Sequence, residues 1–169
     1  MSRAFVNEDN QEEAPIIPPR APLPDGVPNY VTKKGFDLLK KERSLLHEEI
    51  EQLHSLEDDK DKRYKMQLAK GKLALLDARI SSARILEVSE NETEEVRFGA
   101  KVTLRFTNEK TEQTLQLVGV DEANVKEQKI AFTAPIAKAI TGKRIGDKAD
   151  LQLGRDKRSM EVISIDYEL

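Results

Sequence analysis

The 169-residue sequence contains no cysteine and no tryptophan, and aromatic residues make up only 5% of it. Without cysteine there are no disulfides and no thiolate chemistry, which fits a reducing compartment. The sequence has no apolar run of about 18 residues and no basic-then-apolar amino terminus, so we expect a cytoplasmic protein with no membrane partner. The net charge of −3 argues against a general nucleic-acid coat, which would be basic.

Residues that could form a self-contained catalytic or metal centre are equally scarce. The only histidines, His47 and His54, lie seven residues apart on a predicted helix. That spacing separates them by about 10 Å along the axis, too far to share one metal ion. No Ser-His-Asp set and no phosphate-binding glycine loop can be assembled.

The sequence is rich in charge, and residues 31–88 show a long helical periodicity. Charged residues make up 35% of the chain and hydrophobic residues 38%, which suits a rod that buries one stripe per helix. Apolar residues recur at steps of three, seven, four and three before an apolar-free heptapeptide, residues 57–63, and resume after it. We predict two helices, about 31–56 and 63–87, paired as an antiparallel coiled-coil hairpin with the heptapeptide at its tip. The stripe residues are Phe36, Leu39, Leu46, Ile50 and Leu53, then Met66, Leu68, Leu73, Leu76, Ile80, Ala83 and Leu86.

The segments on either side of the hairpin differ in composition. Residues 1–29 hold six of the seven prolines, so we expect an extended or disordered leader, with Ile16, Ile17 or Leu23 available for packing. Residues 91–169 show period-2 alternation and turn signals, which predict a small, mostly antiparallel sheet. One short helix is expected between Pro135 and Gly142. The predicted fold class is α+β, with a helical hairpin at residues 30–90.

The heptapeptide has two interpretations. Glu57, Asp58, Asp59 and Asp61 place four carboxylates within five residues, and such a sequence is typical of a soluble turn with helix caps. Alternatively, these oxygens are ligands for a Mg²⁺ ion held by another molecule, because Mg²⁺ often takes one or two protein carboxylates and keeps several waters. The chain lacks a second acidic cluster, so any such site would be completed in trans.

Three motifs follow in order in the carboxy-terminal half. They are Phe98-Gly99-Ala100-x-Val102-Thr103-Leu104, Val118-Gly119-Val120-Asp121-Glu122-Ala123, and Ala134-Pro135-Ile136-Ala137-Lys138-Ala139-Ile140-x-Gly142-Lys143-x-x-Gly146-Asp147. With Val31-Thr32-x-x-Gly35-Phe36-x-x-Leu39 and Arg79-Ile80 on the helical arms, they resemble the bacterial Gre transcript-cleavage factors, the GreA/GreB family. The resemblance covers about residues 30–168.

This resemblance implies a monomeric partner of RNA polymerase with an FKBP-like carboxy-terminal domain that docks at the secondary channel. Asp121, Glu122, Ala134 and Pro135 of the matching motifs are the candidate docking residues. The hairpin would enter the channel near the nascent RNA 3′ end. The protein would not be an enzyme itself and would have no cofactor of its own, since the polymerase cleaves backtracked RNA with its own Mg²⁺ ions.

The family's tip has an acidic residue, two spacers and a second acidic residue, and Asp58 and Asp61 match these two positions. They are the candidate catalytic and metal-binding residues, with Asp59 assisting. Lys62 replaces the family's asparagine, Glu57 replaces a glycine, and each arm is shorter by about a heptad, or roughly 10 Å. Two alternatives therefore stay open: a non-cleaving channel regulator with a shorter probe, and a structural coiled coil that self-associates.

Overall fold

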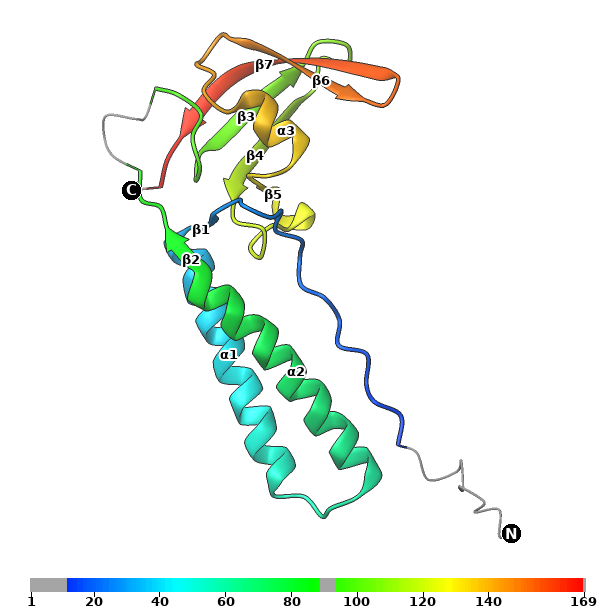
Figure 1. Ribbon diagram of the computed structural model, residues 1–169. Helices are drawn as coiled ribbons and strands as arrows, with labels where there is room; N and C mark the ends of the chain where they lie inside the picture. The colour runs from blue at the N-terminus through cyan, green and yellow to red at the C-terminus, as the bar shows by residue number, and fades with distance from the viewer. Residues whose placement is uncertain (1–11, 89–93, 169) are drawn as a thin grey trace.

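Two long helices and a strand-rich domain make up the computed structural model, which describes residues 12–88 and 94–168. The helices, α1 (Lys33–His54) and α2 (Lys60–Ser82), form an antiparallel hairpin that projects away from the domain (Figure 1). The predicted hairpin is therefore confirmed, with the acidic tip at its far end. Within the described residues, none of the helices has the length and hydropathy of a membrane span.

The seam between the helices follows the predicted stripe. Leu39, Leu46 and Leu53 are buried at intervals of seven residues on α1, and Leu76 of α2 is fully buried beside them. Thr32 is the N-cap of α1: its hydroxyl accepts a hydrogen bond from the Gly35 N–H at 2.9 Å. The hairpin is thus specified by local periodicity and by a cap visible in the sequence.

The ends of the helices differ from the prediction. Helix α2 stops at Ser82 instead of residue 87, and β2 (Ala83–Ile85) pairs in parallel with β1 (Asn29–Val31). The Asn29 side-chain amide donates to the Arg79 carbonyl at 2.9 Å, which links β1 to the last turn of α2. Leu86 therefore lies outside the helix and is partly exposed. The cause is a partner more than fifty residues away in sequence, which helical periodicity does not reveal.

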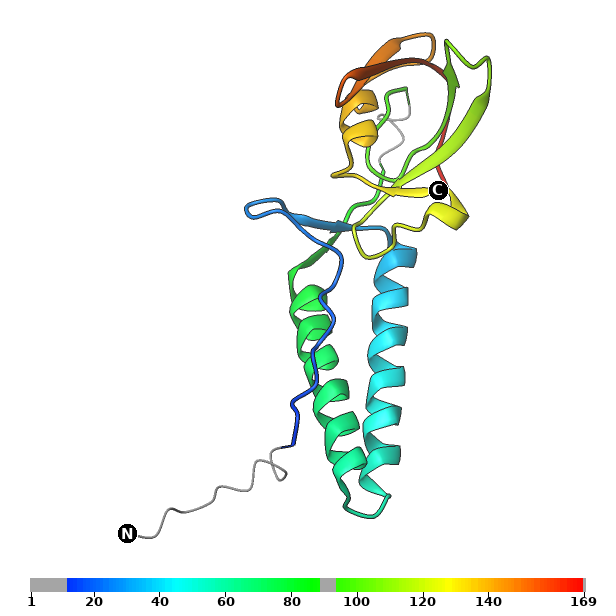
Figure 2. The same cartoon turned by 90° about the vertical axis from the view of Figure 1, so that its right-hand side faces the viewer.

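The domain contains a five-stranded sheet in the order β5-β4-β3-β7-β6, in which only the β4–β5 pair is parallel. The short helix α3 (Pro135–Ile140) lies against the sheet (Figures 1 and 2). It packs on the core through Ala137 and Ile140. The predicted α+β class is confirmed. The strands are β3 (Lys101–Phe106), β4 (Glu112–Val118), β5 (Lys129–Ala131), β6 (Lys148–Leu153) and β7 (Asp156–Asp166), with a 3₁₀ turn η3 (Val125–Glu127) before β5.

The base of the hairpin is packed against this domain. The ring of Tyr30 in β1 lies 6.1 Å from that of Phe98 and 5.6 Å from that of Phe132, between centroids. A Cβ atom at Gly119 would lie 2.5 Å from the Tyr30 carbonyl oxygen, so the two backbones approach closely there. The Thr32 hydroxyl also donates to Glu122 Oε2 at 2.6 Å. These contacts form the joint between probe and domain.

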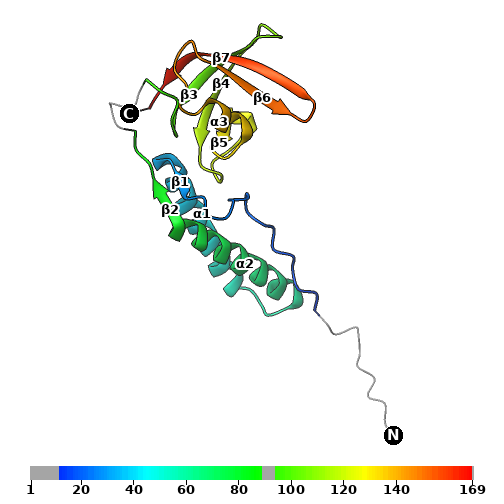
Figure 3. The same cartoon turned by 45° about the horizontal axis from the view of Figure 1, so that its top comes forward.

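Residues 12–28 run in an extended conformation along α2, from its tip end toward the hairpin base (Figures 2 and 3). Ile17 packs against Gly71 of α2, and Leu23 lines the same groove, whereas Ile16 is exposed. Gly71 therefore accommodates the leader. At Gly35, similarly, the close neighbour is the Glu122 side chain instead of another backbone.

Candidate functional site

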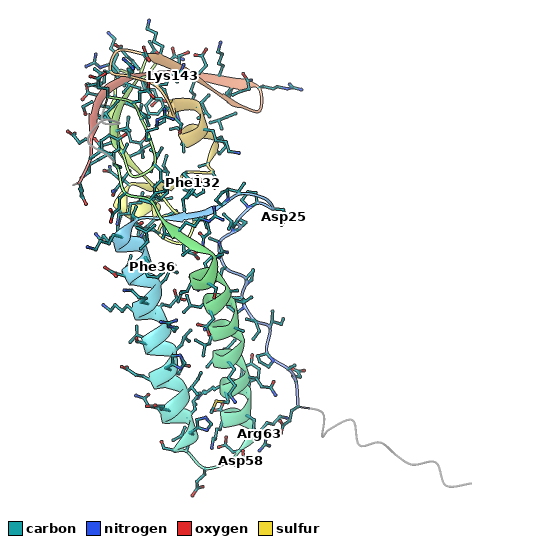
Figure 4. The ribbon with its side chains drawn as sticks, turned by 60° about the vertical axis from the view of Figure 1, so that its left-hand side comes forward. Asp25, Phe36, Asp58, Arg63, Phe132 and Lys143 are labelled. Atoms are coloured by element: carbon teal, nitrogen blue, oxygen red, sulfur yellow. The ribbon has the colours of Figure 1, made fainter. Side chains whose placement is uncertain are left out.

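The acidic tip occupies the free end of the hairpin, where Asp58 and Arg63 are labelled in Figure 4. The tip loop connects His54, the last residue of α1, to Lys60, the first residue of α2. The side chains of Asp58 and Asp61 are each 71% exposed. The candidate ligands therefore point into solvent at the end of a rod, as an in-trans site requires.

The three aspartates have different local roles. Asp59 is the N-cap of α2, and its carboxylate accepts a hydrogen bond from the Lys62 N–H at 2.7 Å. Asp58 forms an ion pair with Arg63 at 3.1 Å, and Asp61 forms one with Lys65 at 2.8 Å, one helical turn on. Asp59 thus fixes where α2 begins, while Asp58 and Asp61 carry charge on either side of that cap.

Basic side chains organise the tip as much as the acidic ones. The Lys62 ammonium donates to the Leu56 carbonyl oxygen at 2.8 Å and so closes the loop. Arg63 binds Asp58 through one edge of its guanidinium and Glu12 of the leader through the other, with Nε donating to Glu12 Oε1 at 3.0 Å. These hydrogen bonds raise the pKa of Arg63 and lower that of Glu12.

The tip carboxylates do not form a metal site by themselves. In residues 12–88 and 94–168, no three His, Cys, Asp or Glu side chains are grouped so that they could hold a metal ion. The ion pairs of Asp58 and Asp61 are solvent-exposed, and exposed pairs contribute little to stability. Both carboxylates are therefore held only weakly by their arginine or lysine partner.

The four candidate docking residues lie in two separate places, away from the tip. Asp121 and Glu122 are buried at the joint, where Asp121 pairs with Arg20 at 2.9 Å and Glu122 lies 3.5 Å from Lys129. Ala134 and Pro135 start α3, where Ala134 is half-buried and Pro135 is exposed. Both carboxylates are thus engaged within the chain, and docking through these four positions stays a prediction.

Three residues were missed in the sequence analysis. Arg63 and its partner Glu12 hold the tip, and Arg20 of the leader pairs with Asp121 at the joint. Arg20 is the one arginine among the leader prolines, which is the sole signal that sequence offers for its role. Nothing local indicates that Glu12 and Arg63, 51 residues apart, would meet.

Comparison with known proteins places this architecture in a family. The family model described as "Transcription elongation factor, GreA/GreB, C-term" matches residues 90–167. A curated relative from Vibrio vulnificus, "Transcription elongation factor GreA", is 30% identical over 151 residues, covering 81% of this chain and 96% of the relative. The chain belongs to the GreA/GreB family.

Other GreA relatives align over a shorter stretch. The GreA proteins of Hyphomonas neptunium and Beijerinckia indica are 39% and 35% identical to this family member. Those alignments cover 62% and 60% of the chain, and it spans only 66% and 64% of the two relatives' own lengths.

Solved structures of GreA factor homolog 1 (Gfh1) are also similar in sequence. The Thermus thermophilus protein is 26% identical, with 81% of this chain and 97% of that one covered and a TM-score of 0.39. The Thermus aquaticus protein is 28% identical, with 80% and 96% covered and a TM-score of 0.40.

Proposed function

We propose that this GreA/GreB family member binds bacterial RNA polymerase, inserts its hairpin into the secondary channel and stimulates cleavage of backtracked RNA near the nascent 3′ end. The observation that carries the proposal is the exposure of Asp58 and Asp61 at the free end of a helical rod. Relatives named transcription elongation factor GreA support a role in transcription elongation.

In this proposal the chain supplies ligands and position, and the polymerase performs the chemistry. Asp58 and Asp61 offer carboxylate oxygens to the second Mg²⁺ ion of the polymerase active centre, which is where a two-metal mechanism needs negative charge. Asp59 assists by capping α2, since the N-cap determines where the helix begins and therefore where Asp61 lies. The carboxy-terminal domain docks outside the channel, and the chain works as a monomer without a cofactor of its own.

The test is RNA cleavage by stalled elongation complexes in the presence of Asp58→Asn, Asp61→Asn and the double variant. We expect each single variant to reduce stimulated cleavage by at least about tenfold, since each removes one charged ligand. Asp77→Asn is the matched control, because Asp77 is a half-exposed aspartate of α2 outside the tip. Full cleavage with the double variant would rule out this role.

A second candidate is a non-cleaving regulator that occupies the secondary channel, and the shorter arms that the family resemblance implies favour it. Helix α1 has 22 residues and α2 has 23, so the rod is about 33–35 Å long. Insertion of a heptad into each arm would extend the reach by roughly 10 Å and preserve the seam. If reach is the only defect, the lengthened protein gains cleavage activity that the natural protein lacks.

Self-association through the coiled-coil seam is not favoured by the structure. Leu39, Leu46 and Leu76 are buried inside the hairpin of a single chain, so this stripe is not available to a second copy. A solution mass that rises with protein concentration would contradict the monomeric state proposed here.

A further inference from the structure

Arg20 of the proline-rich leader bridges the hairpin and the strand-rich domain. Its guanidinium donates to both oxygens of Glu42 on α1, at 2.7 and 3.1 Å, and to Asp121 of the domain at 2.9 Å. Hydrogen bonding to Glu42 raises the pKa of Arg20 although burial opposes it. One leader side chain therefore ties α1 to the loop that follows β4.

The same cluster includes α2. Arg79 of α2 donates from Nη2 to the Ala21 carbonyl oxygen of the leader at 2.6 Å, and its Nε lies 3.4 Å from Asp121 Oδ2. Asp121 is buried, and its Oδ2 accepts no hydrogen bond from the described residues. Its charge is therefore balanced by Arg20 and Arg79 together, and loss of either leaves a buried carboxylate poorly compensated. We call Arg20, Glu42, Arg79 and Asp121 the Arg20 clasp.

The leader reaches this cluster in a defined path. Ile17 fits against Gly71 of α2, and a turn in which the Val27 N–H donates to the Pro24 carbonyl oxygen at 3.1 Å returns the chain to β1. Prolines restrict the backbone between these points, so less freedom is lost when the leader docks. The leader is thus seated by steric fit, by hydrogen bonds and by charge.

We propose that the Arg20 clasp fixes the direction of the hairpin relative to the domain, and that Arg20 is a positioning residue for the tip. The joint at Thr32 acts as a pivot, and Glu42 lies ten residues further along α1, which is about 15 Å from it. A contact at that distance resists tilting far better than one at the pivot. Without it, a tilt of about 10° moves the end of a 22-residue helix by about 6 Å, more than a metal ligand tolerates.

The first test measures this direction without the polymerase. Because the chain has no cysteine, Lys60→Cys at the tip and Lys148→Cys in the domain can each carry a spin label at a unique site. Pulsed electron paramagnetic resonance then gives the distance distribution between tip and domain. We expect Arg20→Gln to widen it at least about twofold, and Arg20→Lys to do so as well, because an ammonium does not reproduce the planar fork that spans two carboxylates.

Matched variants keep this test decisive. Arg105→Gln removes an exposed arginine–glutamate pair on the sheet and should leave the distribution unchanged. Glu42→Gln weakens the clasp while the pair between Asp121 and Arg79 stays in place, so it should widen the distribution even if Arg20→Gln lowers stability. Distributions as narrow as that of the unsubstituted protein in both Arg20→Gln and Glu42→Gln would overturn the proposal.

The positioning role rests on the proposed function, and a cleavage assay with Arg20→Gln separates the two. A loosely held tip should lower the saturating cleavage rate about tenfold without changing the half-saturating concentration, since docking by the domain is unaffected. A widened distribution with full cleavage overturns the positioning role. A widened distribution combined with no cleavage by the unsubstituted protein supports the clasp and rejects the proposed function.

Discussion

Ile17 occupies the space that a side chain at position 71 would need, since a Cβ atom there would lie 2.4 Å from Ile17 Cδ1. Glycine inside a helix costs about 1 kcal/mol relative to alanine. At this position the cost is offset by the close seating of the leader on α2. The leader is thereby part of the folded hairpin from Glu12 onward, instead of a free extension.

This contact predicts that the effect of alanine at position 71 on the free energy of unfolding depends on the side chain at position 17. Gly71→Ala alone should not stabilise the protein, because the gain in helix propensity is lost when Ile17 is displaced. In an Ile17→Ala background the same change should raise the free energy of unfolding by about 1 kcal/mol. Urea unfolding of the four proteins in the double-mutant cycle gives the coupling. Equal effects of Gly71→Ala in both backgrounds would show that the leader does not contact the helix in solution.

The hairpin and most strands could be predicted from sequence because their signals are local. Leu39, Leu46 and Leu53 repeat every seven residues, and this spacing requires a partner stripe nearby. The β1–β2 pair, in contrast, joins Asn29 to Ala83, and no periodicity reports a parallel partner that far along the chain. Residues 96–100 alternate like a strand, yet β3 begins only at Lys101, because Gly99 has a φ of +87° and turns the chain.

At the site, too, local features could be predicted from the sequence and partners distant in sequence could not. The spacing of Asp58 and Asp61 marked the tip, and the structure places both at its exposed end. The acidic motif at 121–122 lies at the joint between hairpin and domain, and its burial depends on Arg20 and Lys129, which lie elsewhere in the sequence. Charge partners of this kind follow from the tertiary fold and carry no local pattern.

Two substitutions at Asp59 distinguish its role as the N-cap of α2 from the role of its negative charge at the tip. Asp59→Ala should lower the free energy of unfolding by about 1 kcal/mol, because the first turn of α2 loses its N-cap. Asp59→Asn keeps an oxygen that accepts the Lys62 N–H bond and should be nearly neutral. Thermal unfolding followed by circular dichroism distinguishes the two variants. If asparagine destabilises as much as alanine, the negative charge and not the cap holds the loop.

Glu122 is expected to be the most sensitive carboxylate at the joint. Its side chain is only 3% exposed, and it accepts a hydrogen bond from Thr32 and faces Lys129. Glu122→Ala should cost about 3 kcal/mol, because it leaves the buried Lys129 ammonium with less compensation. Glu127→Ala removes the exposed partner of the same lysine and should change stability by no more than about 0.5 kcal/mol. Similar losses in urea unfolding for both would contradict this assignment.

The pH dependence of stability should include a contribution from Asp150 on β6. Its carboxylate accepts a hydrogen bond from Ser159 at 2.6 Å and pairs with Lys157 at 3.2 Å across the β6–β7 ladder, and these contacts lower its pKa below the ordinary 3.8. A carboxylate with a lowered pKa stabilises the fold above its unfolded pKa, and this stabilisation is lost as the pH falls through the folded pKa. The unsubstituted protein should therefore exceed Asp150→Asn in stability at about pH 6, and the difference should shrink toward about pH 2. Urea unfolding at both pH values tests this, with Asp156→Asn in the same β-hairpin as control. A difference that does not change with pH would mean that the asparagine perturbs packing instead of charge.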